Sequence, residues 1–237
     1  GIGAATAAAF NQAGAAVIGL DLDAQIVARS NDAFLGVECD ITDGQALDRA
    51  FDAAVQRFGG LDVVVCNAGM FPPSAPIASL SDDLWRRVMA VNLDANVALL
   101  RTAAPLLANS PRGGRVVVNA SKNVAAPGPG AAAYSASKAA LTQLARVAAL
   151  EWAPQGVRVN VVHPNAVFDT GIWDDATLAS RAESYGLSLE EYKRNNLLGV
   201  EVASTDVAAV IVALCSATFA KTTGAQIPID GGNERVV

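Results

Sequence analysis

The sequence predicts an α/β fold in which helices cover both faces of one parallel sheet. Apolar runs that suit strands recur along the chain, and most of them are continuous rather than alternating. Continuous apolar runs are typical of strands buried on both faces. Helical stretches separate these runs in a regular strand–helix alternation, which favours a doubly wound arrangement.

The boundaries of the elements follow from the apolar runs and the stretches between them. Strands are expected at residues 15–20, 35–39, 61–66, 115–119, 157–162 and 226–229. Helices are expected at residues 4–13, 45–58, 82–108, 131–152 and 205–216. The chain has 237 residues, 52% of them hydrophobic, so we expect a single domain over residues 1–237 with a large core.

Charge and cysteine content narrow the class of protein. The net charge is -6 and no basic run occurs, which disfavours nucleic acid or an anionic membrane as a partner. No apolar run reaches membrane-spanning length, and no signal peptide is visible. Cys39, Cys66 and Cys215 are far apart and lack metal-binding spacing. We therefore expect buried thiols, no metal and a cytoplasmic location.

The first residues resemble part of a dinucleotide-binding motif. Gly1, Ile2 and Gly3 open a predicted helix, and Asp21 follows the strand predicted at 15–20. A Gly-x-Gly at a helix start, with an acid about twenty residues on, is the later half of that motif. The earlier half is a strand that lies centrally in such sheets, so we expect a gap in the sheet and further residues upstream. Two turn glycines before a helix are the alternative.

Acidic residues after the first two predicted strands suit a nucleotide. Asp21 is expected to accept hydrogen bonds from the adenosine ribose, and its charge favours NAD over NADP because a 2'-phosphate would be repelled. A helix N-cap, at Asp21 or Asp23, is the alternative. Asp40 is placed to bond the adenine amino group and Ile41 to pack on the ring. An N-cap and a core isoleucine explain Asp40 and Ile41 equally well.

Small residues follow the strand predicted at 61–66. Asn67, Ala68 and Gly69 stand at its carboxyl end, where parallel sheets place their ligands. Ala68 and Gly69 are small enough to let the backbone approach a cofactor closely. An ordinary Asn-Ala-Gly turn is the alternative.

The residues with the clearest chemistry are Tyr134 and Lys138. They are four positions apart in a predicted helix and so share one face. An ammonium beside a phenol can stabilise the phenolate and lower the pKa of the tyrosine. Ser121 follows the strand at 115–119, thirteen residues before Tyr134, and can donate to the same substrate oxygen. A turn or cap role for Ser121, and Asn119 or Lys122 as competitors, remain open.

Three further features are less specific. Asn92 lies in the middle of the helix predicted at 82–108, where asparagine is unfavourable, so it is expected to distort the helix and hold a water. A solvent-facing asparagine, like Asn96, is the alternative. His163, the only histidine, lacks a partner for nucleophilic catalysis and is expected to be a strand-end residue beside the crevice. Residues 170–196 interrupt the alternation with aromatic residues and suggest a substrate lid, or else a subunit contact.

Together these positions resemble the short-chain dehydrogenase/reductase family, which has a Rossmann fold. The matching features, in family order, are Gly1 to Gly3, Asp21, Asp40, Asn67 to Gly69, Asn92, Ser121, Tyr134, Lys138, Pro164 and Asp230 to Gly232. The chain departs from the family pattern where Asn165, rather than glycine, follows Pro164, and where Thr170 stands six residues past that proline.

The resemblance implies hydride transfer between NAD and a small-molecule substrate. Tyr134 would act as the base, Lys138 would bond the nicotinamide ribose, Ser121 would hold the substrate oxygen and Asn92 would support a water. It also implies cofactor contacts from Pro164 and Val167, substrate contacts from Asn123 and Trp173, and a homodimer or homotetramer formed through the helices at 82–108 and 131–152.

A narrower resemblance concerns the substrate. Stretches at 163–168, 171–173, 185–187, 193–199 and 221–224 look like the dehydrogenase half of bifunctional rhamnulose-1-phosphate aldolase/alcohol dehydrogenases. This implies a lactaldehyde-like substrate, rhamnose metabolism and a fused N-terminal aldolase domain. Another sugar, polyol or 3-oxoacyl substrate is the alternative. A catalytically silent NAD-binding or oligomerisation module is a third possibility, which the complete Ser–Tyr–Lys set disfavours.

Overall fold

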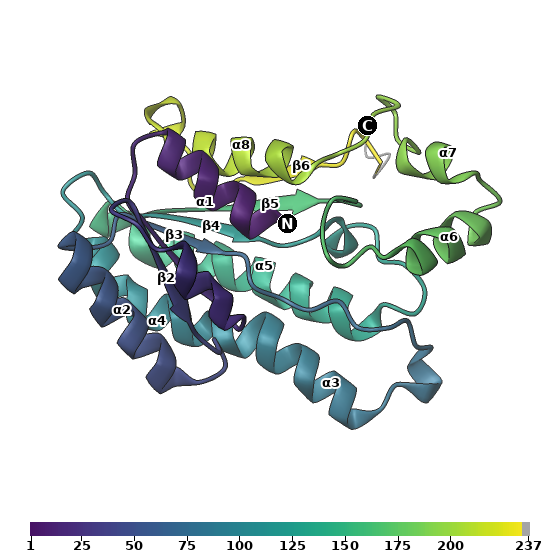
Figure 1. Ribbon diagram of the computed structural model, residues 1–237, viewed down its shortest axis with the longest axis horizontal. Coiled ribbons are helices and arrows are strands. Elements are labelled where there is room, and N and C mark those ends of the chain that lie inside the picture. Colours follow the sequence, from purple (N-terminus) through teal and green to yellow (C-terminus); the bar gives the residue numbers. More distant parts are fainter. Residues whose placement is uncertain (234–237) are drawn as a thin grey trace.

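The computed structural model describes residues 1–233 and has the expected α/β architecture, with parallel strands between layers of helices (Figure 1). All strand pairings are parallel. The strands are β1 (Val17–Asp21), β2 (Phe34–Glu38), β3 (Val63–Cys66), β4 (Arg115–Asn119), β5 (Arg158–Pro164) and β6 (Gln226–Ile229). The predicted doubly wound fold class is therefore confirmed.

The strands form two sheets rather than one. β1 pairs with β2, and β3 to β6 form a second sheet in sequence order. No strand among residues 1–233 joins β1 to β3, and a cavity of about 2660 Å³ is lined by residues of both. The division lies where the sequence predicted a missing central strand.

Helices cover the two faces of the four-stranded sheet. On one face lie α1 (Ile2–Gln12) and α8 (Ser204–Cys215), which pack against each other; they stand above the strands in Figure 1. The other face carries α2 (Gly44–Phe58), α4 (Ala95–Ala108) and α5 (Ala132–Trp152). Short 3₁₀ helices are η1 (Ala24–Arg29), η2 (Ile77–Ser79), η4 (Lys122–Val124), η5 (Ala153–Gln155) and η6 (Ala217–Phe219). None of the helices in this described part is both long and apolar enough to pass through a bilayer.

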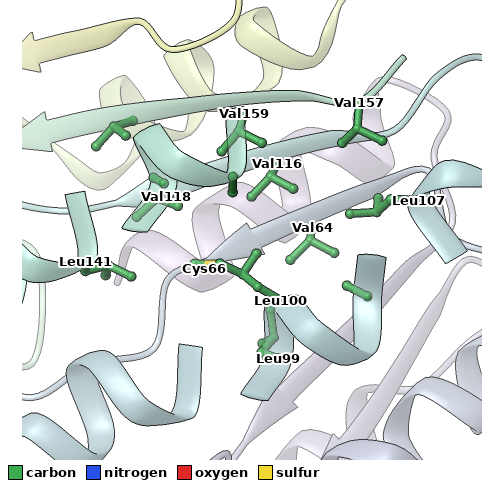
Figure 2. Packing of buried hydrophobic residues seen from close by; sticks show 14 of the residues in the cluster. Val64, Cys66, Leu99, Leu100, Leu107, Val116, Val118, Leu141, Val157 and Val159 are labelled. Carbon is green, nitrogen blue, oxygen red and sulfur yellow. The ribbon is translucent and has the colours of Figure 1, made fainter. Parts of the chain in front are cut away.

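Alternate residues of the central strands pack against helices on opposite faces of the sheet. Val116 and Val118 of β4 pack beneath α4 and α5, whereas Val117 between them packs with Ile211 of α8. Figure 2 shows the first of these clusters, in which strand valines meet leucines of α4 and α5. A strand with apolar residues on both faces must be continuous in hydrophobicity, which explains the apolar runs. The three cysteines are free and buried, as expected.

The helix predicted at 82–108 is not continuous. It consists of α3 (Asp82–Met89), a π-helical turn at Ala90–Asp94 labelled η3, and α4. Asn92 lies in that turn and is fully buried. The expected distortion is therefore confirmed, but the solvent-facing alternative is wrong for Asn92 and for Asn96, which is buried as well.

Candidate active site

Tyr134 and Lys138 lie on one face of α5, near its N-terminal end. Lys138 is buried, and its Nζ donates a hydrogen bond to the carbonyl of Asn119 at the end of β4, over 2.9 Å. The same Nζ lies 5.9 Å from the centre of the Tyr134 ring. Lys138 thus points to the carboxyl end of β4, and Tyr134 shares its face of the helix, as the spacing predicted.

The pKa values of this pair depend mainly on burial. Burial lowers the pKa of Lys138 from 10.5 to about 8. Burial raises the pKa of Tyr134, and a hydrogen bond with the Ser121 side chain opposes that rise. The direction for Tyr134 is opposite to the lowering that we expected from Lys138, because loss of solvation around the phenol outweighs the hydrogen bond with Ser121.

Ser121 stands two residues beyond β4 and caps η4. Its Oγ accepts a hydrogen bond from the backbone N–H of Asn123 over 3.2 Å. Ser121 is therefore the cap of η4, a role that the sequence left open. Its side chain also forms a hydrogen bond with Tyr134. Asn123 lines the same cavity, so the predicted substrate contact is near the site. At the same strand end, Nδ2 of Asn119 donates to Oδ1 of Asn67, and Lys122 donates to Oδ1 of Asn233.

His163 supports Ser121 from the neighbouring strand. The imidazole is buried on β5, with Nδ1 at 2.9 Å from the Ser121 carbonyl and Nε2 at 3.1 Å from Oε1 of Gln226 on β6. A carbonyl can only accept, so Nδ1 carries the proton of that hydrogen bond. The sequence placed His163 correctly at a strand end but gave no sign of this contact.

Asn92 ties three segments together. Its Oδ1 accepts from the Met70 N–H over 2.8 Å, and its Nδ2 donates to the Met70 carbonyl and the Ser137 hydroxyl, each over 3.0 Å. Ser137 in turn donates to the carbonyl of Tyr134. The Asn92 side chain therefore holds the loop after β3 against α5. Its expected support of a water stays a prediction.

Two residues that touch this machinery were missed by the sequence analysis. Ser137 lies within the Tyr-x-x-x-Lys segment, three residues after Tyr134, and its spacing could have indicated the contact. Phe71 packs edge-on against Tyr134, with ring centres 4.6 Å apart. No pattern in the sequence indicates that pair, which depends on the loop after β3.

The N-terminal glycines and the 67–69 segment meet at the end of the sheet. A Cβ on Gly3 would lie 2.7 Å from the Asn67 amide nitrogen, and one on Gly69 would lie 3.1 Å from Oδ1 of Asn92. Both positions therefore require glycine or a rearrangement of their neighbours. Ile2, Gly3 and Ala68 line the large cavity, and Gly1 stands against Thr170. The crowding comes from neighbouring side chains, and the glycines leave the backbone at the α1 N-terminus open to a pyrophosphate.

The acidic residues divide between capping and cavity lining. Asp23 caps η1, whereas Asp21 ends β1, faces the cavity and accepts from the Asp23 N–H. Asp40 accepts from the Thr42 N–H and hydroxyl, which lowers its pKa. Ile41 is partly buried against the core and also lines the cavity. The α2 N-cap is Asp43, so the N-cap alternatives for Asp21 and Asp40 are wrong, although Asp40 does bond its own turn.

The loop after β5, which differs from the family pattern in sequence, contains a residue in an unfavourable backbone conformation. Ala166 has a φ of 45°, a left-handed conformation that is unfavourable for a residue with a Cβ. Val167 is buried in the core beside α8 and also lines the cavity, as do Pro164 and Asn165. Thr170 donates to the Val167 carbonyl over 2.8 Å, so this loop is closed on itself.

Residues 170–196 contain two short helices, α6 (Asp175–Ser184) and α7 (Leu189–Lys193). In Figure 1 both stand at the end of the molecule where β5 terminates. Trp173 and Tyr192 pack on Phe168, with ring centres 4.9 and 5.8 Å away respectively, and Tyr185 packs on Tyr192. Trp173, Tyr185 and Tyr192 all line the large cavity, which brings the predicted substrate contact at Trp173 to the site.

One cavity connects these parts. Gly3, Asp21 and Asp40 line it on one side, and Ser121, Tyr134, Lys138 and Trp173 line it on the other. A glycine-lined helix start beside a Ser–Tyr–Lys set at the carboxyl ends of parallel strands defines a nicotinamide-dependent oxidoreductase.

Comparison with known proteins places the chain within this class. Residues 1–234 match the family model described as Enoyl-(Acyl carrier protein) reductase. The chain is 35% identical over 240 residues to 4-formylbenzenesulfonate dehydrogenase from Comamonas testosteroni, covering 98% of the chain and 93% of the relative. The chain belongs to the short-chain dehydrogenase/reductase family.

Two further matches bear on length and fold. Uncharacterized oxidoreductase YuxG from Bacillus subtilis is 36% identical over 246 residues, which cover 98% of this chain but only 36% of that protein. A crystal structure of 3-ketoacyl-(acyl-carrier-protein) reductase from Brucella melitensis complexed with NADH has a TM-score of 0.86 and 25% identity, covering 99% of this chain and 94% of that one.

Proposed function

We propose that this protein transfers hydride between NAD and a small hydroxy or carbonyl compound, with Tyr134 as the acid–base group. The supporting observation is that Ser121, Tyr134 and Lys138 line one cavity, with Lys138 buried and held by Asn119. These groups are the ones that proton transfer at an alcohol oxygen requires.

The chain's own residues handle the proton and the oxygen. In oxidation, the Tyr134 phenolate takes the proton of the substrate hydroxyl, and Ser121 donates to the substrate oxygen while the carbonyl forms. The Lys138 ammonium balances the phenolate charge. A bound nicotinamide supplies the acceptor for the hydride that leaves the same carbon. In reduction, Tyr134 returns the proton.

The proposed cofactor contacts come from the ends of several strands and from the start of α1. They are Gly1, Ile2, Gly3, Asp40, Ile41, Asn67, Ala68, Gly69, Pro164 and Val167. Asp21 is proposed to select NAD, because it lines the cavity at the end of β1 and a 2'-phosphate there would meet a carboxylate. The adjacent cap on η1 is provided by Asp23, which supports a separate role for Asp21.

Lactaldehyde is the first substrate to test, on the narrower resemblance to the dehydrogenase half of rhamnulose-1-phosphate aldolase/alcohol dehydrogenases. If the aldehyde is oxidised, the reacting hydroxyl belongs to its hydrate. The chain spans 36% of the length of YuxG, so a further domain such as an aldolase remains a proposal. Another sugar, polyol or 3-oxoacyl compound is the alternative, and the lid at 170–196 is proposed to decide between them.

A homodimer or homotetramer is also proposed. The support is on α5, where Val147 and Leu150 are 41% and 78% exposed. Apolar side chains side by side on a helix surface suit a subunit contact. A silent NAD-binding module, the remaining alternative, would have no need for the Ser–Tyr–Lys set.

The test combines turnover with cofactor binding. Tyr134→Phe should lose on the order of 10²–10⁴-fold in turnover, the size of an acid–base contribution, while titration of NADH fluorescence shows unchanged binding. Asp21→Ala should weaken NAD more than NADP. Full turnover by purified Tyr134→Phe protein would refute the assignment, and equal losses for both nucleotides would remove Asp21 from cofactor selection. Binding without turnover on any alcohol or aldehyde would favour the silent module.

A further inference from the structure

An aromatic contact joins the loop after β3 to the proposed base. This loop, residues 67–76, runs from β3 to η2 and carries Phe71, whose ring packs edge-on against Tyr134. The ring centres are 4.6 Å apart and the ring planes meet at 69°, a favourable edge-to-face arrangement. Both side chains are half-buried and line the large cavity. Phe71 therefore covers part of the phenol with apolar surface.

The backbone before Phe71 is held by one buried side chain. Oδ1 of Asn92 accepts from the Met70 N–H over 2.8 Å, and Nδ2 of Asn92 donates to the Met70 carbonyl over 3.0 Å. The same Nδ2 donates to the Ser137 hydroxyl, which donates to the carbonyl of Tyr134. Asn92 therefore links the residue before Phe71 to the backbone that carries the phenol.

The backbone after Phe71 is held by the start of α5. The Ala75 N–H donates to the Gly130 carbonyl over 3.0 Å, and Ala75 forms a parallel bridge with Ala131. Ala131 is the residue that precedes α5. Because the attachments on both sides of Phe71 lead to α5, its ring keeps its position relative to Tyr134 and restricts the orientation of the phenol.

The charges around the phenol come from other segments, because residues 67–76 contain no ionisable side chain. The helix α3, which also packs against α5, carries only exposed charges. Among the described residues, the other ionisable groups close to this end of α5 are Lys138, Cys66, which interacts electrostatically with Lys138, Lys122 on η4, His163 behind Ser121, and Arg181, which contacts Ser74. Replacement of Phe71 leaves all of these groups in place, so it changes the access of water to the phenol and not its charged neighbours.

We propose that Phe71 is a positioning residue for Tyr134, which fixes the orientation of the phenol ring and shields it from water. This inference rests on the proposed role of Tyr134 as the acid–base group. Proton transfer requires the phenol oxygen to lie within hydrogen-bond reach of the substrate oxygen, and a misplacement of about 1 Å can cost on the order of 10²-fold in rate. Water at a phenolate stabilises the charged form, which weakens it as a base.

The first test follows the ionisation of Tyr134 and needs no turnover. The chain has three tyrosines, so Tyr185→Phe and Tyr192→Phe together leave Tyr134 as the only phenol. In this background, the ultraviolet absorbance of tyrosinate would be titrated over the pH range in which circular dichroism shows an intact fold. Burial raises the pKa of Tyr134, so Phe71→Ala should lower the midpoint by on the order of 1 pH unit. Phe71→Leu, which keeps an apolar cover, should lower it by less.

The second test measures turnover and cofactor binding. With NAD and lactaldehyde, or with another alcohol or aldehyde that the wild type oxidises, Phe71→Ala should lower kcat by on the order of 10–10²-fold, and Phe71→Leu should recover part of it. NADH fluorescence should show unchanged affinity. The rise of kcat/KM with pH should move to lower pH, since a base of lower pKa loses its proton earlier. Phe219→Ala, which truncates a half-buried ring on η6 outside the cavity lining, is the matched control.

The outcomes separate this proposal from the proposed function. An unchanged midpoint in Phe71→Ala, an unchanged kcat, or losses equal to those of Phe219→Ala would overturn the role of Phe71. A lowered midpoint without turnover of any compound by the wild type would support the shielding of the phenol by Phe71 and refute the dehydrogenase. A lowered midpoint and kcat in Phe71→Ala, with full activity in Phe219→Ala, would support both.

Discussion

The buried charge of Lys138 predicts an unusual dependence of stability on pH. The side chain is 4% exposed, and burial lowers its pKa from 10.5 to about 8. Between these two values the unfolded chain holds the proton and the folded chain does not, so stability rises with pH across this window. Below pH 8 the folded state carries the full cost of the buried ammonium. Each pKa unit corresponds to about 1.4 kcal/mol, so the fall in the pKa of Lys138 corresponds to a cost on the order of 3 kcal/mol.

Lys138→Met removes the charge while keeping most of the volume. We would measure the free energy of unfolding in urea from pH 7 to pH 10.5, for wild type and variant. The wild type should gain on the order of 3 kcal/mol relative to Lys138→Met across this range. Lys221→Met, which removes an exposed ammonium, controls for the change in net charge. A difference between wild type and Lys138→Met that does not vary with pH would refute the reasoning.

Two other predictions follow from close contacts. His163→Leu removes one of the two hydrogen bonds that the Ser121 carbonyl accepts, the other coming from the Val124 N–H, at a cost of about 0.5–1.5 kcal/mol. We expect kcat to fall with NAD affinity unchanged, whereas His163→Asn, whose Nδ2 can take the place of Nδ1, should recover kcat. Equal kcat in both variants would show that His163 only fills space. Gly36→Ala places a Cβ 1.9 Å from the Ile26 carbonyl oxygen, so unfolding in urea should show a loss of about 1–3 kcal/mol. Gly44→Ala, with no atom within 4 Å, should be nearly neutral, and equal stability of the two variants would contradict the clash.

Sequence patterns over a few residues were sufficient to predict most strands and helices and the placement of the main site residues. The strands at 115–119 and 226–229 match β4 and β6 to the residue, because each is a short apolar run bounded by turn residues. The Tyr134–Lys138 pair needed only helical spacing. All of these features depend on residues that are near each other in the sequence.

The features that sequence reasoning missed depend on residues distant in the chain. The distortion at Asn92 was expected, but its hydrogen bond to Ser137, 45 residues away, was not. The His163–Ser121 contact requires the register between β4 and β5. The rise in the pKa of Tyr134 follows from burial, which an i, i+4 spacing does not reveal.

The π-turn at Ala90–Asp94 sets the rotational phase of the helices on either side of it. A π-turn is equivalent to one residue inserted into an α-helix, and each residue turns an α-helix by about 100°. α3 and α4 are therefore out of phase by about a quarter turn compared with a regular helix. Rewinding this turn as regular α-helix with the same number of residues would rotate Leu99, Leu100 and Ala103 away from the strands that they cover. The same residues that hold the loop of the site thus also determine which face of α4 belongs to the core.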